Sequence, residues 1–198
     1  MTFIKFCGIT RIEDVVTAAD LGVDAVGFVL WPGSPRCVEM RHLAPLIKEL
    51  PPTVTPVGVF VAPGVNNVQQ ARDAGVRVVQ IHGDDGRRFD GEVWLARTLE
   101  DADLLDRINP DATLVLDAHD PVRHGGTGRT IDWARAARVA AMRRVLLAGG
   151  LTPANVGAAI SQVRPFGVDV ASGIEDRPGV KNAQAMQAFV AAVRGAEQ

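Results

Sequence analysis

Short apolar runs alternate with amphipathic stretches along almost the whole chain, and each kind of segment predicts one kind of element. The apolar runs are rich in Val, Ile, Leu and Phe and are bounded by Gly, Pro or polar residues, which is typical of β-strands. They predict strands at Phe3–Cys7, Asp24–Leu30, Val54–Val61, Arg77–Ile81, Glu92–Ala96, Thr113–Leu116, Arg144–Leu147 and Gly167–Val170. Apolar residues at helical spacing predict helices at Arg11–Leu21, Glu39–Leu50, Val65–Ala74, Leu99–Ile108, Ile131–Ala141, Pro153–Val163 and Ala183–Val193.

Eight strand-helix units in succession favour an α/β fold, a closed (β/α)8 barrel that forms one domain over residues 1–198. The strands are nearly continuous apolar runs, as expected of a parallel sheet that is covered on both faces. The alternative is a doubly wound open sheet, but it would need an early glycine-rich dinucleotide turn that the chain lacks. One connection, Gly83–Gly91, is too short for an ordinary helical crossover, and we expect a stunted or irregular helix there.

Composition and charge narrow the class of protein. The 198 residues are 47% hydrophobic and carry a net charge of −2, so we expect no nucleic-acid or membrane partner. No apolar run approaches the roughly 20 residues needed to span a bilayer. The first residues lack the blocks of a secretory signal, and the two cysteines, Cys7 and Cys37, are best interpreted as reduced thiols. These features predict a cytoplasmic protein.

The ends of the predicted strands carry the candidate chemistry, because the active sites of such barrels lie at the C-terminal ends of the strands. Cys7 ends the first strand and Asp117 follows the sixth, so the two residues should face one cavity from opposite sides. A thiolate and a carboxylic acid placed in this way can act as base and acid on a small substrate. Lys5 points the same way as Cys7 and can either polarise the thiol or pair with an acid. Taken singly, Cys7 also fits a buried small hydrophobe, and Asp117 a loop-capping carboxylate.

Two glycine-containing pairs predict a phosphate site. Gly149-Gly150 follows the seventh strand and Ser172-Gly173 follows the eighth, where barrels of this kind bind phosphate through backbone N–H groups. Either pair alone also fits a simple tight turn between a strand and a helix. Together, on neighbouring strands, they favour a phosphorylated small-molecule substrate.

The remaining candidates lie in loops and near the fourth strand. Arg36 follows a proline in a polar loop and suits a carboxylate, although an exposed arginine is the alternative. His82 can orient a ligand or be structural, and Gln80 should lie inside the barrel, where its amide needs partners. The polar loop Asp120–Thr130, which contains Gly126, predicts a lid over the substrate or else a plain connection. No metal-ligand spacing and no cofactor motif is found, so we expect neither a metal nor a cofactor.

Taken in order, the segments at the strand ends resemble the phosphoribosylanthranilate isomerase family of tryptophan biosynthesis. The matching segments are Lys5–Thr10 (KFCGIT), Ser34–Arg36 (SPR), Gly58–Phe60 (GVF), Gln80–Gly83 (QIHG), Leu116-Asp117, Gly125–Gly128 (GGTG), Ala148–Leu151 (AGGL), Asp169–Glu175 (DVASGIE) and Pro178–Lys181 (PGVK). Two departures stand out: Cys37 occupies a position that is usually aromatic, and Asn182 replaces the usual aspartate after PGVK.

The resemblance implies an Amadori rearrangement of N-(5-phosphoribosyl)anthranilate without a cofactor. It implies that Asp117 is the general acid at the furanose ring oxygen and that Cys7 is the general base at C2. It assigns Arg36 to the anthranilate carboxylate and the backbone around the two glycine-containing pairs to the phosphate. His82 and Gly126 complete the candidate substrate-binding residues. Members of the family occur as monomers and as dimers, so either a monomer or a homodimer is expected.

Two alternatives from the same residues remain open. One is a related phosphate-binding barrel, the isomerase of histidine biosynthesis, or an enzyme with both activities; an aspartate would be expected where Cys7 stands. The other is a catalytically inactive barrel that binds a phosphorylated ligand. Turnover of freshly generated phosphoribosylanthranilate distinguishes these hypotheses.

Overall fold

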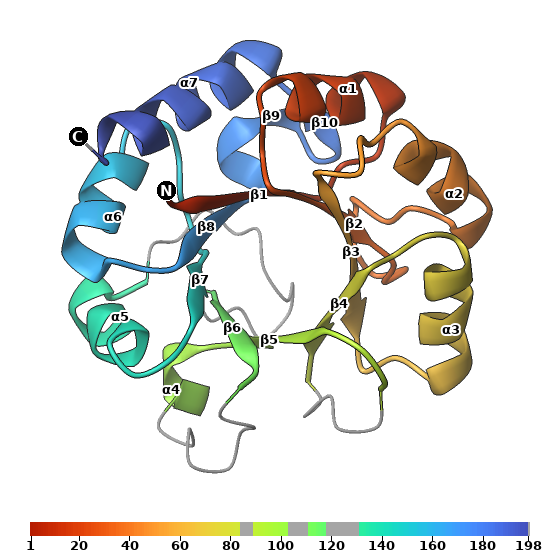
Figure 1. Cartoon of the computed structure of the whole chain (residues 1–198), viewed down its shortest axis with the longest axis horizontal. Helices are drawn as coiled ribbons and strands as arrows, with labels where there is room; N and C mark the ends of the chain where they lie inside the picture. The colour runs from red at the N-terminus through yellow and green to blue at the C-terminus, as the bar shows by residue number, and fades with distance from the viewer. Residues whose placement is uncertain (84–88, 103–110, 118–130, 198) are drawn as a thin grey trace.

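The computed structural model describes residues 1–83, 89–102, 111–117 and 131–197. Eight parallel strands form a closed barrel in which each strand pairs with the next along the chain and β1 pairs with β8 (Figure 1). The strands are β1 (Phe3–Cys7), β2 (Ala25–Val29), β3 (Thr55–Val61), β4 (Val78–His82), β5 (Val93–Arg97), β6 (Thr113–Leu116), β7 (Val145–Leu147) and β8 (Gly167–Val170). The predicted (β/α)8 barrel is confirmed, and the open-sheet alternative is wrong.

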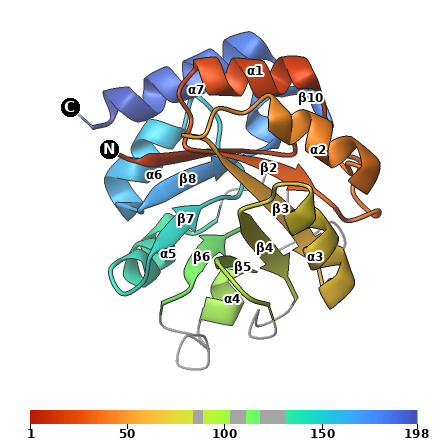
Figure 2. The same ribbon diagram turned by 45° about the vertical axis from the view of Figure 1, so that its right-hand side comes forward.

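Helices surround the outside of the barrel, as both views show (Figures 1 and 2). They are α1 (Ile12–Asp20), α2 (Met40–Lys48), α3 (Val65–Asp73), α4 (Leu99–Ala102), α5 (Trp133–Ala140), α6 (Val156–Val163) and α7 (Ala183–Gly195). Their ends agree with the predicted helices to within about two residues at most positions, since Gly and Pro mark most of the boundaries. None of the helices in the described part of the chain is long and apolar enough to cross a membrane.

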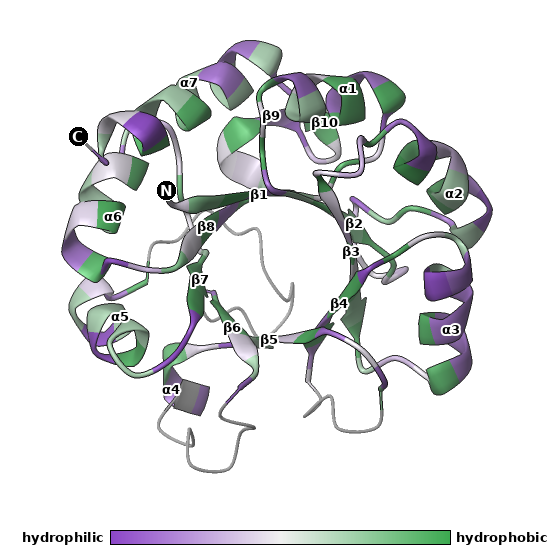
Figure 3. Ribbon diagram, in the orientation of Figure 1, coloured by the Kyte–Doolittle hydropathy of each residue, from purple (hydrophilic) through white to green (hydrophobic). Residues whose placement is uncertain are grey.

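The alternation of side chains along the strands builds two apolar layers. On β1, Ile4 and Phe6 are completely buried between the barrel and the helices. Lys5 and Cys7 point the other way, into the barrel, where residues such as Val57 fill the interior. Hydrophobic residues accordingly follow the strands and the inner faces of the helices (Figure 3). The C-terminal end of β1 therefore carries a thiol into the barrel mouth on a strand whose three central residues are buried.

The start of α6 differs from the prediction. The sequence predicts a helix that begins at Pro153, but α6 begins at Val156 with Asn155 as its N-cap residue. The side chain of Asn155 instead accepts a hydrogen bond from the Thr152 N–H at 2.8 Å, and residues 153–155 form a turn. An asparagine that hydrogen-bonds nearby backbone competes with the helix for its first turn.

A short hairpin after β8 was not predicted. A 3-10 turn (Ser172–Ile174) leads into β9 (Glu175–Arg177), which pairs antiparallel with β10 (Val180–Lys181). These strands are too short and too polar to give an alternating pattern. The hairpin lies between α1 and α7 (Figure 1), and the side chains of Arg11 and Asp14 hydrogen-bond the main chain of Lys181.

Several predicted features lie outside the described residues. They include the lid Asp120–Thr130 with Gly126, the second half of the helix Leu99–Ile108, and most of the connection Gly83–Gly91. The described part of the helix at Leu99 is helical through Ala102.

Candidate active site

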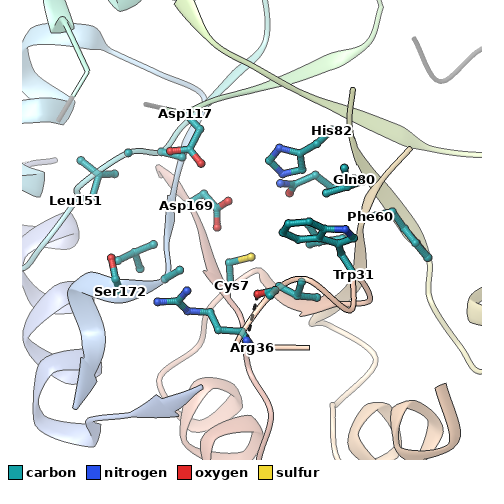
Figure 4. A pocket seen from close by; sticks show the side chains of 18 of the residues that line it. Cys7, Trp31, Arg36, Phe60, Gln80, His82, Asp117, Leu151, Asp169 and Ser172 are labelled. Carbon is teal, nitrogen blue, oxygen red and sulfur yellow. Dashed lines mark hydrogen bonds between the residues drawn. The ribbon is translucent and has the colours of Figure 1, made fainter. Parts of the chain in front are cut away.

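A pocket opens at the C-terminal ends of the barrel strands. The lining residues are Cys7, Val29, Trp31, Ser34, Arg36, Val59, Phe60, Val61, Gln80, His82, Asp117, Ala148, Gly149, Gly150, Leu151, Asp169, Val170, Ala171 and Ser172. Figure 4 shows Cys7 and Asp169 pointing into one opening, with Trp31 and His82 on one side and Leu151 and Ser172 on the other.

Cys7 and Asp117 both line this pocket from different strands. Cys7 is the last residue of β1, and Asp117 directly follows β6. The Asp117 backbone N–H donates to the Arg97 carbonyl at 3.0 Å, which fixes the carboxylate-bearing residue at the end of its strand. A thiol and a carboxylic acid therefore reach one cavity from separate sides of the barrel (Figure 4).

A buried ion pair lies beside the thiol. Lys5 Nζ is 2.8 Å from Asp169 Oδ2, on register partners of β1 and β8, and the Lys5 side chain has no exposed surface. Burial by itself lowers the pKa of Lys5, but the charge of Asp169 and the neighbouring Cys7 outweigh it and raise that pKa. The second oxygen of Asp169, Oδ1, is buried and has no hydrogen-bond partner within the described structure. Lys5 is therefore a stable cation, and Asp169 keeps one acceptor available.

The Cys7 thiol has a raised pKa, chiefly because burial disfavours the thiolate. The positive charge of Lys5 acts in the opposite direction, and so does that of Lys181. Gly27 on β2 provides the space for this arrangement, since an added Cβ would lie 2.9 Å from Cys7 Sγ and 3.2 Å from Lys5 Nζ. The thiol is thus held close to cations, while burial disfavours its ionised form.

The backbone after β7 and β8 forms a tight cradle. Gly149 and Gly150 have φ angles of 81° and 65°, which L-residues with a side chain rarely adopt. Gly173 approaches the loop after β7 so closely that an added Cβ would lie 1.9 Å from the Leu151 carbonyl oxygen. Ser172 lines the pocket beside these segments. The two predicted glycine-containing pairs therefore lie next to one another, and Gly173 packs behind the pocket rather than lining it.

Asn155 supports this cradle, and sequence reasoning missed it. Its Nδ2 donates to the Gly150 carbonyl at 2.9 Å while its Oδ1 accepts from the Thr152 N–H. Both bonds tie the loop after β7 to the start of α6. The signal in the sequence is an asparagine five residues after a glycine pair, which is too general to stand out.

Arg36 lines the pocket but is engaged by a carboxylate of the protein. Its Nε lies 2.9 Å from Glu175 Oε1 and its Nη2 lies 2.7 Å from Glu175 Oε2. Lys181 Nζ also contacts Glu175 Oε1, at 2.8 Å. Burial works to raise the pKa of Glu175, but the hydrogen bonds from Arg36 and the charge of Lys181 outweigh it and lower that pKa. Glu175 and Lys181 were not among the predicted site residues.

The opposite wall combines aromatic, apolar and polar groups. Trp31, which the sequence analysis did not select, lines the pocket together with Val59. An added Cβ on Gly33 would lie 2.4 Å from the Trp31 ring, so this glycine lets the indole fold back over its own loop. His82 lines the pocket as predicted, and Gln80 is buried inside the barrel with Oε1 unpartnered within the described structure. Cys37 lies outside this pocket and lines a separate one beside α2.

The arrangement suits acid–base chemistry on an anionic ligand. The pocket offers the Cys7 thiol, the carboxyl groups of Asp117 and Asp169, the Arg36 guanidinium and a glycine cradle. In the described ranges, no three His, Cys, Asp or Glu side chains gather closely enough to hold a metal ion.

Comparison with protein families and curated proteins gives one consistent result. The family model for N-(5'-phosphoribosyl)anthranilate (PRA) isomerase matches residues 4–192. The N-(5'-phosphoribosyl)anthranilate isomerase of Pelobacter propionicus is 42% identical over 197 residues, covering 96% of this chain and 94% of its own. That of Nitrosococcus oceani is 40% identical over 201 residues, covering 97% of both chains.

Solved structures agree with this result. The phosphoribosyl anthranilate isomerase of Thermotoga maritima superposes with a TM-score of 0.88 at 33% identity, covering 98% of this chain and 100% of its own. The Thermotoga enzyme is dimeric. A phosphoribosyl anthranilate isomerase bound to reduced 1-(o-carboxyphenylamino)-1-deoxyribulose 5-phosphate superposes at 0.84 with 31% identity, covering 98% and 100%. With this fold, this pocket and these relatives, the chain belongs to the N-(5'-phosphoribosyl)anthranilate isomerase family.

Proposed function

We propose that the protein converts N-(5-phosphoribosyl)anthranilate into 1-(2-carboxyphenylamino)-1-deoxyribulose 5-phosphate, an Amadori rearrangement in tryptophan biosynthesis. The observation that carries the proposal is that Cys7 and Asp117 line one pocket that also borders the glycine cradle. The family match over residues 4–192 supports the same reaction. The relative bound to the reduced product analogue supports a phosphorylated substrate that carries a carboxyphenyl group. A cytoplasmic monomer or homodimer stays our prediction for the protein as a whole.

The substrate binds through its two anionic ends. The phosphate accepts hydrogen bonds from the backbone around Gly149-Gly150 and Ser172, close to the start of α6. The carboxylate of the anthranilate binds the guanidinium of Arg36, whose planar fork suits a carboxylate. The aromatic ring packs on the apolar wall at Trp31, and His82 contacts the sugar or the ring.

Asp117 and Cys7 then act in sequence on the ribose. Asp117 donates a proton to the ring oxygen as the C1–O bond breaks, and the nitrogen lone pair forms an iminium at C1. The positive iminium acidifies the proton on C2, which Cys7 removes as a thiolate. The electron pair of that C–H bond forms an enolamine, which takes a proton at C1 and loses one from its C2 hydroxyl to give the aminoketone. The reaction is an isomerisation without gain or loss of atoms.

Lys5 and Asp169 prepare the thiol for its role. Burial raises the pKa of Cys7, and the Lys5 ammonium stabilises the thiolate when it forms. A bound iminium adds a second positive charge at the point of proton removal. The unpartnered Oδ1 of Asp169 accepts a hydrogen bond from the substrate next to the reacting carbon.

The test is turnover of freshly generated phosphoribosylanthranilate, followed by the loss of its fluorescence. We expect rapid loss at catalytic concentrations of the protein. No acceleration over the uncatalysed decay, with a phosphorylated ligand still bound, would favour the inactive-barrel alternative. Turnover of the aminoaldose substrate of histidine biosynthesis would instead favour the related isomerase, although a thiol at position 7 speaks against it.

A further inference from the structure

Three charged residues form a buried chain between the ends of β1 and β8, outside the acid–base pair described above. Glu175 accepts from Arg36 Nη2 at 2.7 Å and from Lys181 Nζ at 2.8 Å. The exposed fractions of the three side chains are 11% for Arg36, 3% for Glu175 and 0% for Lys181. Two basic side chains share one carboxylate beside the pocket. Burial lowers the pKa of Lys181, and the charge of Glu175 acts in the opposite direction.

Lys181 connects the two strand ends. Its Nζ donates to the Cys7 carbonyl at 2.6 Å, to the Ala171 carbonyl at 3.0 Å and to Glu175. An ammonium has three protons, and all three are used here. The end of β1, which carries the thiol, is thereby joined to the end of β8, which leads into Ser172.

The main chain of Lys181 is held independently of its side chain. Arg11 Nη2 donates to the Lys181 carbonyl at 3.2 Å, and Asp14 Oδ2 accepts from the Lys181 N–H at 3.3 Å. These two main-chain hydrogen bonds hold the β9–β10 hairpin against the start of α1 even when the Lys181 ammonium is removed. The hydrogen bonds of the ammonium are therefore not needed to keep the hairpin in place.

Glu175 fixes the guanidinium of Arg36 in one orientation. It binds Nε and Nη2, and within the described structure Nη1 has no partner. Arg36 lines the pocket, and an added Cβ on Gly8 would lie 2.6 Å from its Cδ, so the stem is confined as well. A guanidinium that is oriented before the ligand arrives loses less conformational entropy on binding.

We propose that Glu175 and Lys181 are positioning residues for the aromatic carboxylate end of the substrate and for Cys7. Glu175 holds Arg36 so that its Nη1 edge meets a carboxylate, and Lys181 holds the end of β1 against the end of β8. This inference rests on the proposed isomerase function and adds two residues that act through Arg36 and Cys7 without contacting the reacting atoms.

The first test is Glu175→Gln, which keeps the shape of the side chain and removes its charge. We expect KM for phosphoribosylanthranilate to rise about tenfold, the order expected when one ordered side chain is released, with kcat within about threefold of the wild type. Glu39→Gln is the matched control, because Glu39 is 63% exposed and pairs with the exposed Arg41. If Glu175→Gln fails to fold, Glu175→Asp replaces it, because it keeps the charge but withdraws the carboxylate from Arg36. The same rise in KM is expected for this variant.

Two further readouts separate positioning from a general structural effect. In an Arg36→Met background, Glu175→Gln should leave KM unchanged, because the group it positions is absent. Ribose 5-phosphate lacks the aromatic carboxylate, so its competitive inhibition constant should be the same for Glu175→Gln and the wild type. Equal increases in KM and in that inhibition constant, or an additive double variant, would overturn the role of Glu175.

Lys181→Met tests the other half of the proposal. We expect kcat to fall at least tenfold, because the end of β1 that carries Cys7 is released, while the inhibition constant of ribose 5-phosphate stays within about threefold. Thermal unfolding confirms that each variant is folded. Unchanged kcat in folded Lys181→Met would refute its role. A wild-type protein without turnover would instead refute the proposed function itself and remove the basis of this inference.

Discussion

Gly173 offers the sharpest test of the cradle, because the structure leaves no room for a single methyl group. An alanine Cβ at this position would lie 1.9 Å from the Leu151 oxygen and 2.9 Å from its carbonyl carbon. Real Cβ contacts are not found below 3.0 Å, so the two loops must separate by at least about 1.1 Å. Both obstructing atoms are backbone, so no side-chain rotation relieves the overlap. We expect Gly173→Ala to destabilise the fold by about 1–3 kcal/mol, the usual range for overpacking.

The matched control is Gly157→Ala, in the first turn of α6. An added Cβ at Gly157 in α6 has no atom nearer than 3.8 Å, which is ordinary van der Waals contact. Alanine favours a helix over glycine by about 1 kcal/mol, so this variant should be at least as stable as the wild type. The two substitutions are chemically identical and differ in the space that the structure provides and in the helical setting of Gly157.

Urea unfolding gives the stability of both variants, and competitive inhibition by inorganic phosphate reports on the cradle. Gly173→Ala should lose stability and raise the phosphate inhibition constant about tenfold or more, since a shift of about 1 Å breaks the hydrogen-bond geometry of the backbone donors. Gly157→Ala should bind phosphate like the wild type. Wild-type stability and phosphate binding in Gly173→Ala would refute the close approach of the two loops.

Four further outcomes follow from the same site. Cys7→Ala and Asp117→Asn should each lower kcat at least about 100-fold in the fluorescence assay, while Cys37→Ala, outside the pocket, should leave it unchanged. Arg36→Met should mainly raise KM, and an unchanged KM would reject the carboxylate assignment. Because the pKa of Cys7 is raised, kcat/KM should keep increasing with pH beyond the ordinary thiol pKa of about 8.5, and a plateau well below that pH would contradict the role of burial. Because the pKa of Glu175 is lowered, its ionised form stabilises the fold above the unfolded carboxyl pKa of about 4.3, and this contribution is lost as the pH falls through the folded pKa. Urea unfolding measured between pH 7 and 3 should therefore show a smaller loss of stability for Glu175→Gln than for the wild type.

The sequence predicts the barrel well because its strands are buried on both faces. Segments such as Ala25–Leu30 are apolar without interruption, and a parallel sheet between helices leaves few other interpretations. The same rule that places chemistry at strand ends selects Cys7, Asp117 and His82, and all three line the pocket. Residues at the ends of regular elements can be located from the elements alone.

Residues whose role depends on contacts between distant segments could not be predicted in this way. Glu175 lies 139 positions from Arg36 in the chain, and nothing local indicates that its carboxylate binds that guanidinium. Lys181 sits in a two-residue strand that is too short to show a pattern. Trp31 lines the pocket with its ring folded back against Gly33, where an added Cβ would overlap it. In each case tertiary packing, and not periodicity, decides the position of the side chain.

The most direct measurement of the central claim is a crystal structure of the protein with reduced 1-(o-carboxyphenylamino)-1-deoxyribulose 5-phosphate. We predict that the phosphate lies on the backbone around Gly149-Gly150 and Ser172, with the sugar between the Cys7 sulfur and the Asp117 carboxyl group. A ligand that leaves the cradle empty, or that meets the thiol and the carboxyl group from the same side, would contradict the mechanism proposed here.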